Sequence, residues 1–146
     1  MNVLNEITLN YHPKKKDSST RVCSSVEAHK YFEEIWPDDR GMRERFYILL
    51  LNNANRVIGH VELSSGGITG TVVDIRLAFA SALKSLSTSI ILAHNHPSGN
   101  LKPSQADLNL TRKFKEAGKF LDIQVLDHII LDAENLFYSL SDNADF

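Results

Sequence analysis

The hydrophobic and polar positions of the chain follow a helical period in three segments and a strand period in seven. Apolar residues recur every three or four positions over residues 24–36, 74–85 and 104–118, which predicts three amphipathic helices. Alternating or continuous apolar runs predict strands over residues 6–11, 46–51, 56–63, 89–93, 120–125, 128–131 and 136–140. This order predicts an α/β (α+β mixed) fold, with a central mixed β-sheet packed by about three helices.

Residues that favour caps and turns mark the ends of several predicted elements. Ser24, with Glu27 three residues later, has the spacing of a capping box at the start of the first helix, and Pro37 ends that helix. Residues 52–55 are rich in asparagine, which tolerates positive φ, so they predict the turn of a β-hairpin. Gly118 is expected to close the third helix in a left-handed conformation.

Candidate chemistry lies where the apolar run of residues 89–93 ends. His94 and His96 follow it, and side chains two residues apart in an extended chain point to the same face, about 6.6 Å apart at Cα. Asp107 lies beyond a turn-rich loop, in the expected first turn of the third helix, where free N–H groups favour an ionised carboxylate. Two imidazoles and one carboxylate are a ligand set of hydrolytic zinc, with one tetrahedral position left for water. The pattern therefore predicts a catalytic metal site.

The same residues also have structural interpretations. A histidine at a strand end is commonly a surface residue, and Ser104 with Asp107 has the S-x-x-D spacing of a helix cap. The metal site is favoured because His-x-His, a turn-rich loop and an acidic helix start occur together. The single cysteine, Cys23, excludes disulfide frameworks and metal sites built on paired cysteines, so a metal must bind histidine or carboxylate side chains.

Length, charge and hydropathy narrow the class of protein. The chain has 146 residues, 42% hydrophobic and 23% charged, so we expect one domain, with at most a short extension. The longest apolar run, residues 46–51, is too short for a membrane span, and residues 1–10 lack a signal-peptide pattern; we expect a cytoplasmic protein with no membrane partner. The formal net charge of −2 argues weakly against a protein that binds nucleic acid mainly by phosphate attraction.

One stretch of the sequence also resembles a known motif. Residues 94–99 read His-Asn-His-Pro-Ser-Gly, and with Ser104 and Asp107 they resemble the JAMM motif of the JAB/MPN metalloproteases. The sequence of this stretch is similar to that of the bacterial RadC family, whose members also carry a later Asp-His pair, here Asp127 and His128. The spacing, the residue types and the predicted elements agree in this resemblance.

The resemblance extends from about Arg43 to Leu140. It implies that residues 43–146 form a JAB/MPN (RadC-like) domain of cytidine deaminase-like architecture. Residues 1–42 are then expected to form an extension of one strand and one helix packed on that domain. Full-length relatives look to carry an additional N-terminal domain of the helix-hairpin-helix sort, and we expect that nucleic-acid element to be absent here.

The resemblance also implies roles for individual residues. His94, His96 and Asp107 would bind zinc, and Ser104 would help to stabilise the oxyanion that forms when water attacks a carbonyl. His128 stands in an apolar strand and is interpreted as a packed or orienting residue outside the ligand set, although a further ligand is the alternative.

The general base of this reaction has two candidates. Glu44 stands just before the apolar run of residues 46–51, where the JAMM glutamate lies, and is favoured. Glu62, in the second hairpin strand, is the competitor. The structural alternative for Glu44 is an outward ion pair with Arg43 or Arg45.

Three functions follow from these observations. The favoured one is a zinc-dependent hydrolase of peptide or isopeptide bonds, with a peptide or protein substrate. The alternative is a DNA-repair-associated RadC-like protein, for which basic residues of the third helix offer only weak support. A module without catalysis is disfavoured because all the motif residues are present. An HNH nuclease is not indicated, since such nucleases space these residues across a larger unit. The sequence leaves the oligomeric state and the scissile bond open.

Overall fold

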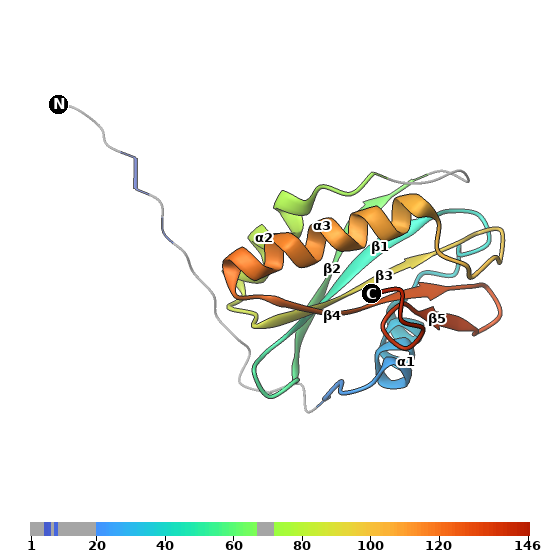
Figure 1. The fold of residues 1–146 in the computed structure, drawn as a ribbon, viewed down its shortest axis with the longest axis horizontal. Coiled ribbons are helices and arrows are strands. Elements are labelled where there is room, and N and C mark those ends of the chain that lie inside the picture. Colours follow the sequence, from blue (N-terminus) through green and yellow to red (C-terminus); the bar gives the residue numbers. More distant parts are fainter. Residues whose placement is uncertain (1–4, 7, 9–19, 67–71) are drawn as a thin grey trace.

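The structure is a computed structural model that describes residues 5, 6, 8, 20–66 and 72–146. The strand predicted over residues 6–11 lies largely outside these described residues. The elements, in chain order (Figure 1), are α1 (Ser25–Ile35), β1 (Arg45–Leu51), β2 (Val57–Ser65), α2 (Ile75–Lys84), β3 (Ser89–Asn95), α3 (Gln105–Leu121), β4 (Gln124–Leu131) and β5 (Phe137–Ser139).

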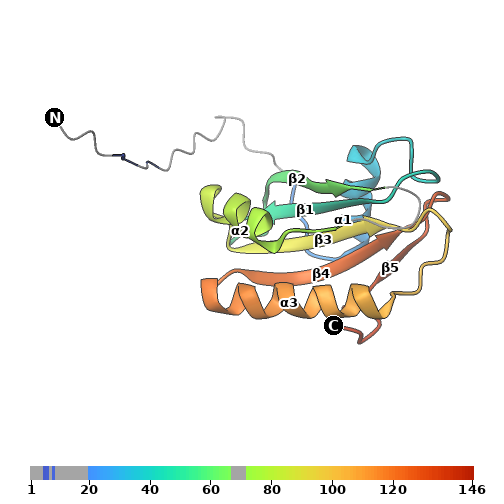
Figure 2. The ribbon, with the colours of Figure 1, turned by 90° about the horizontal axis from the view of Figure 1, so that it is seen from above.

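Five strands form one mixed sheet in the order β2-β1-β3-β4-β5. β1 pairs antiparallel with β2 and β3, β3 pairs parallel with β4, and β4 pairs antiparallel with β5. The parallel pair needs a crossover connection, which α3 supplies. Figure 2 shows α3 running alongside β4, and Figure 1 shows α2 and α3 on the side of the sheet opposite to α1. The predicted mixed sheet with three helices is confirmed.

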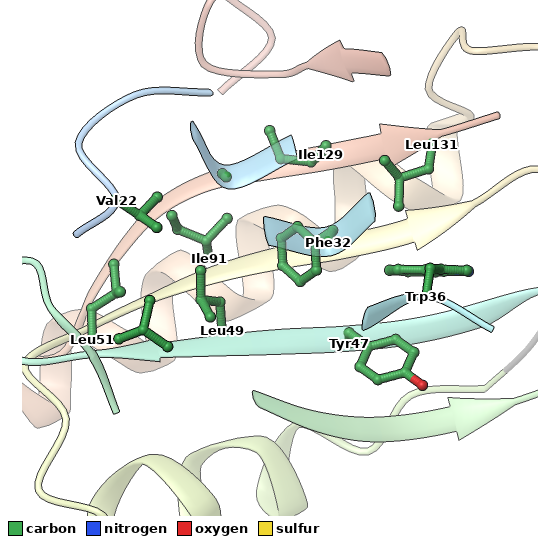
Figure 3. Packing of buried hydrophobic residues seen from close by; sticks show 12 residues of the cluster. Val22, Phe32, Trp36, Tyr47, Leu49, Leu51, Ile91, Ile129 and Leu131 are labelled. Atoms are coloured by element: carbon green, nitrogen blue, oxygen red, sulfur yellow. The ribbon is translucent and has the colours of Figure 1, made fainter. Parts of the chain in front are cut away.

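Two hydrophobic cores cover the two faces of the sheet. On the α1 face, Phe32 and Trp36 pack against Tyr47, Leu49 and Ile91 (Figure 3). The other core lies beneath α2 and α3 and includes Phe46, Ile48, Leu50, Phe79, Ile90, Leu92 and Phe114. Successive strand residues point to opposite faces, so β3 supplies side chains to both cores and is buried along its whole length. The continuous apolar run of this segment correctly predicted a buried strand.

Caps and turns form where the sequence predicted them. Ser24 caps α1 by accepting a hydrogen bond from the backbone N–H of Glu27. The helix ends before Trp36, whose extended backbone is the conformation favoured for a residue that precedes a proline such as Pro37. Asn55, with φ of 57°, provides the left-handed residue of the turn between β1 and β2.

The end of α3 differs from the prediction. Gly118 does not close the helix, which continues to Leu121, and Asp122 adopts the left-handed conformation instead, with φ of 54°. Gly118 meets a different requirement. A Cβ at this position would lie 2.3 Å from the backbone oxygen of Ile123, so only glycine lets the chain turn back this closely against the helix.

The segment after α3 was also predicted incorrectly. Two strands were expected, over residues 120–125 and 128–131, but β4 is one continuous strand. The predicted gap fell at residues 126–127, but Asp127 is buried inside the strand, as is His128 next to it. The Asp127 carboxylate accepts hydrogen bonds from the Ser139 hydroxyl and other donors, which satisfies its oxygens. The pairing of β4 with β3 shifts register just before Asp127, so the strand carries a local irregularity there but does not end.

Gly118→Ala is expected to lower the free energy of unfolding by about 1–3 kcal/mol, because the added methyl group forces backbone to move. Chemical denaturation measures the change. Gly59→Ala is the control, since a Cβ there meets no atom within 4 Å. Equal or higher stability of Gly118→Ala would show that the contact with Ile123 does not constrain this position.

The fold brings the candidate residues to one edge of the sheet, at the carboxyl end of β3 and the start of α3. Open α/β sheets commonly bind ligands beyond the carboxyl ends of their parallel strands. The helix of the predicted extension, α1, contributes to the core, while the division between residues 1–42 and 43–146 stays a prediction. Within the described part of the chain, no helix has both the length and the apolar character needed to cross a membrane.

Candidate metal and catalytic centre

His94 is the next-to-last residue of β3 and is almost completely buried, with 1% of its surface exposed. Its ring is stacked on Phe46 of the neighbouring strand, with ring centroids 5.9 Å apart and planes 7° from parallel. Strand alternation places His94 on the α3 face, with Ile90 and Leu92. This packing fixes the orientation of an imidazole that stands at the edge of the core.

His96 follows the strand and is oriented by the loop after it. Pro97 starts a turn in which the N–H of Gly99 donates to the His96 carbonyl at 3.0 Å, and Gly99 has φ of 80°. The turn brings the Asn100 carbonyl to 2.5 Å from His96 Nδ1. A carbonyl only accepts, so Nδ1 carries the proton in neutral His96 and Nε2 presents a lone pair.

Asp107 is the third residue of α3 and forms a capping box with Ser104. The Asp107 N–H donates to the Ser104 hydroxyl oxygen at 3.0 Å, and the Ser104 N–H donates to Asp107 Oδ2 at 2.8 Å. The structural interpretation of this pair is therefore correct. It does not exclude the chemical one, because the cap holds the Asp107 carboxylate towards the two histidines.

Three potential ligand atoms meet at one point. His94 Nε2 and His96 Nε2 lie 2.8 Å apart, and each lies 3.2 Å from an Asp107 oxygen. A tetrahedral zinc with bonds of about 2.0 Å needs ligand atoms about 3.3 Å apart, so small adjustments accommodate the ion. The donor set and its spacing fit zinc, while the assignment of these residues as ligands stays a prediction.

The charges at this point are strongly coupled. Burial raises the pKa of Asp107, but the adjacent His94 and His96 rings outweigh this effect and hold the pKa well below its usual range. Burial lowers the pKa of His96, but Asp107 and the Asn100 carbonyl outweigh it and raise the pKa overall. The site thus keeps an anionic carboxylate beside the two imidazoles, as a cation site requires.

Glu44 lies beside this cluster, just before β1. One of its carboxylate oxygens and one ring nitrogen each of His94 and His96 lie within 4.8 Å of one another, a distance that a water molecule bridges. Burial raises the pKa of Glu44, against the opposing effect of the two histidines. The Asp107 carboxylate is closer to both imidazoles than the Glu44 carboxylate is. This arrangement suits Asp107 as a metal ligand and Glu44 as a base that acts on a water molecule at the metal.

The other carboxylate and the arginines form a separate group. Arg45 binds Glu62 and also Asp39, the latter at 2.6 Å. Arg43 lies 4.0 Å from Asp39. Among the described residues, neither arginine pairs with Glu44, so the expected alternative of an outward ion pair is not what the structure contains. Glu62 is occupied by Arg45, whereas Glu44 faces the histidines.

Asn95, between the two histidines, has a role that the sequence did not reveal. It is fully buried on the opposite face of β3, where its Oδ1 accepts from the Arg45 N–H at 2.8 Å. Its Nδ2 donates to the carbonyls of Arg40 and Arg43 at 2.9 and 3.0 Å. These bonds bracket Glu44 in sequence, so one side chain joins the histidine strand to the segment that carries the candidate base.

His128 is fully buried and lies outside the ligand cluster. Its Nε2 is 2.7 Å from His94 Nδ1, and its Nδ1 is 2.6 Å from the Thr111 hydroxyl. Burial holds the pKa of His128 well below its ordinary value. Thr111 lies within the predicted third helix, where no local pattern singled it out, because its contact with a histidine of another element depends on the tertiary fold.

Comparison with known families agrees with the geometry. A family model described as a RadC-like JAB domain matches residues 22–145, most of the chain. This chain belongs to the RadC-like JAB family. The resemblance identified from the motif is thereby confirmed, and the mixed α/β fold of this RadC-family chain is consistent with a JAB-like fold.

Several curated relatives of this RadC-family chain are called UPF0758 proteins. The one from Flavobacterium johnsoniae is 52% identical over 103 residues, 70% of this chain and 44% of the relative. The one from Pelobacter propionicus is 39% identical over 129 residues, 88% of this chain and 56% of the relative. The one from Alkaliphilus metalliredigens is 44% identical over 102 residues, 70% and 44% of the two chains. The chain spans about half the length of these relatives.

Proposed function

We propose that this chain is a zinc-dependent hydrolase that cleaves peptide or isopeptide bonds in a peptide or protein substrate. The observation that carries the proposal is the convergence of His94, His96 and Asp107, with the Glu44 carboxylate beside the two imidazoles. Three protein ligands leave one position of a tetrahedral site for water or substrate, the arrangement of catalytic rather than structural zinc.

Zinc would be held by His94 Nε2, His96 Nε2 and the Asp107 carboxylate. When bound, it supplies a Lewis acid that polarises a carbonyl and makes water easier to deprotonate. The remaining chemistry belongs to the chain. Glu44 takes a proton from the attacking water and delivers it to the leaving amine, a double role that its raised pKa supports.

Ser104 is proposed to donate a hydrogen bond to the carbonyl oxygen as negative charge develops on it. The cap uses the Ser104 hydroxyl oxygen as an acceptor, and within the described residues no acceptor takes its proton. A hydroxyl that is held by its oxygen keeps its proton available for such a contact. Asn95 keeps the Glu44 segment in place against β3.

The test is hydrolysis of a mixture of internally quenched fluorescent peptides, including lysine-linked isopeptides, by the zinc-loaded chain. We expect cleavage that stops when a chelator removes zinc and returns when zinc is restored. Cleavage that continues unchanged after complete removal of the metal would contradict the proposal, as would the absence of cleavage by a chain that contains its zinc. The alternative, a DNA-repair-associated RadC-like protein, stays a hypothesis.

A further inference from the structure

A chain of hydrogen bonds leads from the backbone of α3 to the far side of the His94 ring. The Thr111 hydroxyl donates to the Asp107 carbonyl at 2.7 Å, one turn earlier in the helix. The same hydroxyl oxygen lies 2.6 Å from His128 Nδ1, and His128 Nε2 lies 2.7 Å from His94 Nδ1. The side chains that form this series, Thr111, His128 and His94, are buried, with at most 2% of each residue's surface exposed. Water therefore does not substitute for any of these hydrogen bonds.

The acceptor at the start of the chain decides the direction of every bond. A carbonyl oxygen cannot donate, so the single proton of the Thr111 hydroxyl points to Asp107. The hydroxyl oxygen must then accept from His128, which places the proton of a neutral His128 on Nδ1. His128 Nε2 is left as an acceptor, and His94 donates to it from Nδ1.

We propose that Thr111 and His128 are positioning residues that set the tautomer of His94, with the proton on Nδ1 and the lone pair of Nε2 directed at the zinc position. This inference rests on the proposed zinc site for its purpose. The hydrogen bonds themselves are present in the metal-free protein. Asp107, whose carbonyl starts this series of hydrogen bonds, is also the third proposed ligand. Its backbone therefore helps to orient His94, and its side chain supplies a ligand atom.

The tautomers of the two cluster histidines, His94 and His96, are fixed by different hydrogen-bond partners. His96 donates from Nδ1 directly to the Asn100 carbonyl, which has only one possible direction. His94 instead donates to another imidazole, which by itself allows either direction, and only the Thr111 bond removes the ambiguity. With both tautomers set, two Nε2 lone pairs and a carboxylate face one another at 2.8–3.2 Å without a hydrogen atom among them. A cation between them is the natural partner of such an arrangement.

The first experiment reads the tautomers in the metal-free chain. Long-range ¹H–¹⁵N spectra distinguish protonated from unprotonated ring nitrogens, and they are recorded at a pH where the rings are neutral. We expect protons on Nδ1 of both His94 and His128. Thr111→Val removes the hydroxyl at nearly constant shape, and its His94 is expected to gain the tautomer protonated on Nε2, because the Asp107 carboxylate then attracts that proton. Thr111→Ser keeps the hydroxyl and is expected to match the wild type.

The second experiment measures zinc affinity by competition with a chromophoric chelator. We expect Thr111→Val to bind zinc about 10–100-fold more weakly than the wild type, and Thr111→Ser to restore most of the loss. Thermal unfolding of the two metal-free variants checks that both are folded. A purely structural role of Thr111 would change stability without changing the tautomer of His94.

Each arm has a result that overturns the inference. A wild-type His94 with its proton on Nε2 would overturn the inference, and the ¹H–¹⁵N spectrum that shows it needs neither a variant nor bound metal. Wild-type zinc affinity in Thr111→Val would do so as well. A wild-type chain that binds no zinc would instead overturn the proposed function, while the ring-nitrogen spectra still decide the tautomer.

Discussion

Glu44→Gln is expected to keep zinc close to one ion per chain and to lower the rate of peptide hydrolysis by about 10²–10⁴-fold. Removal of a general base from a positioned site has an effect of this size. The glutamine amide preserves the shape of the side chain but cannot accept the proton of the attacking water. Metal analysis of the purified variant and the rate on the peptide mixture measure the two quantities on the same sample.

Two further variants make this result specific. Glu62→Gln is the matched control: its carboxylate pairs with Arg45 and not with the histidines, so we expect it to retain hydrolysis. His96→Ala is expected to lose the zinc, which separates loss of metal from loss of base. Hydrolysis that survives in Glu44→Gln, or that disappears in Glu62→Gln, would remove Glu44 from the mechanism.

Asn95→Ala is expected to lower the free energy of unfolding by about 2–4 kcal/mol. The side chain is fully buried, and its loss leaves the Arg45 N–H and the carbonyls of Arg40 and Arg43 without their partner. Each buried polar group that loses its hydrogen bond costs about 1–3 kcal/mol, and partial access of water to the loop reduces the sum. Chemical denaturation measures the loss.

The control for this variant is Asn109→Ala. Asn109 is exposed on α3 and accepts one bond from Gln105, so its change is expected to stay within about 0.5 kcal/mol. Asn95→Ala should also slow hydrolysis more than it weakens zinc binding, because the bonds that it removes bracket Glu44. Equal stability of the two alanine variants would show that Asn95 does not hold this segment.

Most of the fold follows from local signals. The Ser24 cap, the residue before Pro37 and the asparagine-rich turn each depend on a few neighbouring residues, and the structure forms all three. The His-x-His spacing likewise brought two imidazoles together at the end of a buried strand. Periodicity and capping are properties of short segments, which is why they could be predicted from the sequence.

The errors and omissions concern contacts between distant segments. Gly118 was expected to end α3, but the close approach of Ile123 requires glycine there, a constraint that no local pattern contains. Two strands were expected on either side of residues 126–127, but donors from β5 and the residues after it satisfy the Asp127 carboxylate inside one strand. Asn95 and Thr111 acquire their partners only through the tertiary fold, so their sequence neighbours gave no sign of these roles.

The central claim is that His94, His96 and Asp107 hold one zinc ion. X-ray absorption at the zinc edge of the metal-loaded chain tests it most directly. The account predicts a first coordination sphere of nitrogen and oxygen at about 2.0–2.2 Å, with the outer-shell scattering of two imidazoles, and loss of the bound zinc in His96→Ala. A sulfur neighbour at about 2.3 Å, as from Cys23, or a zinc that stays bound without His96, would contradict it.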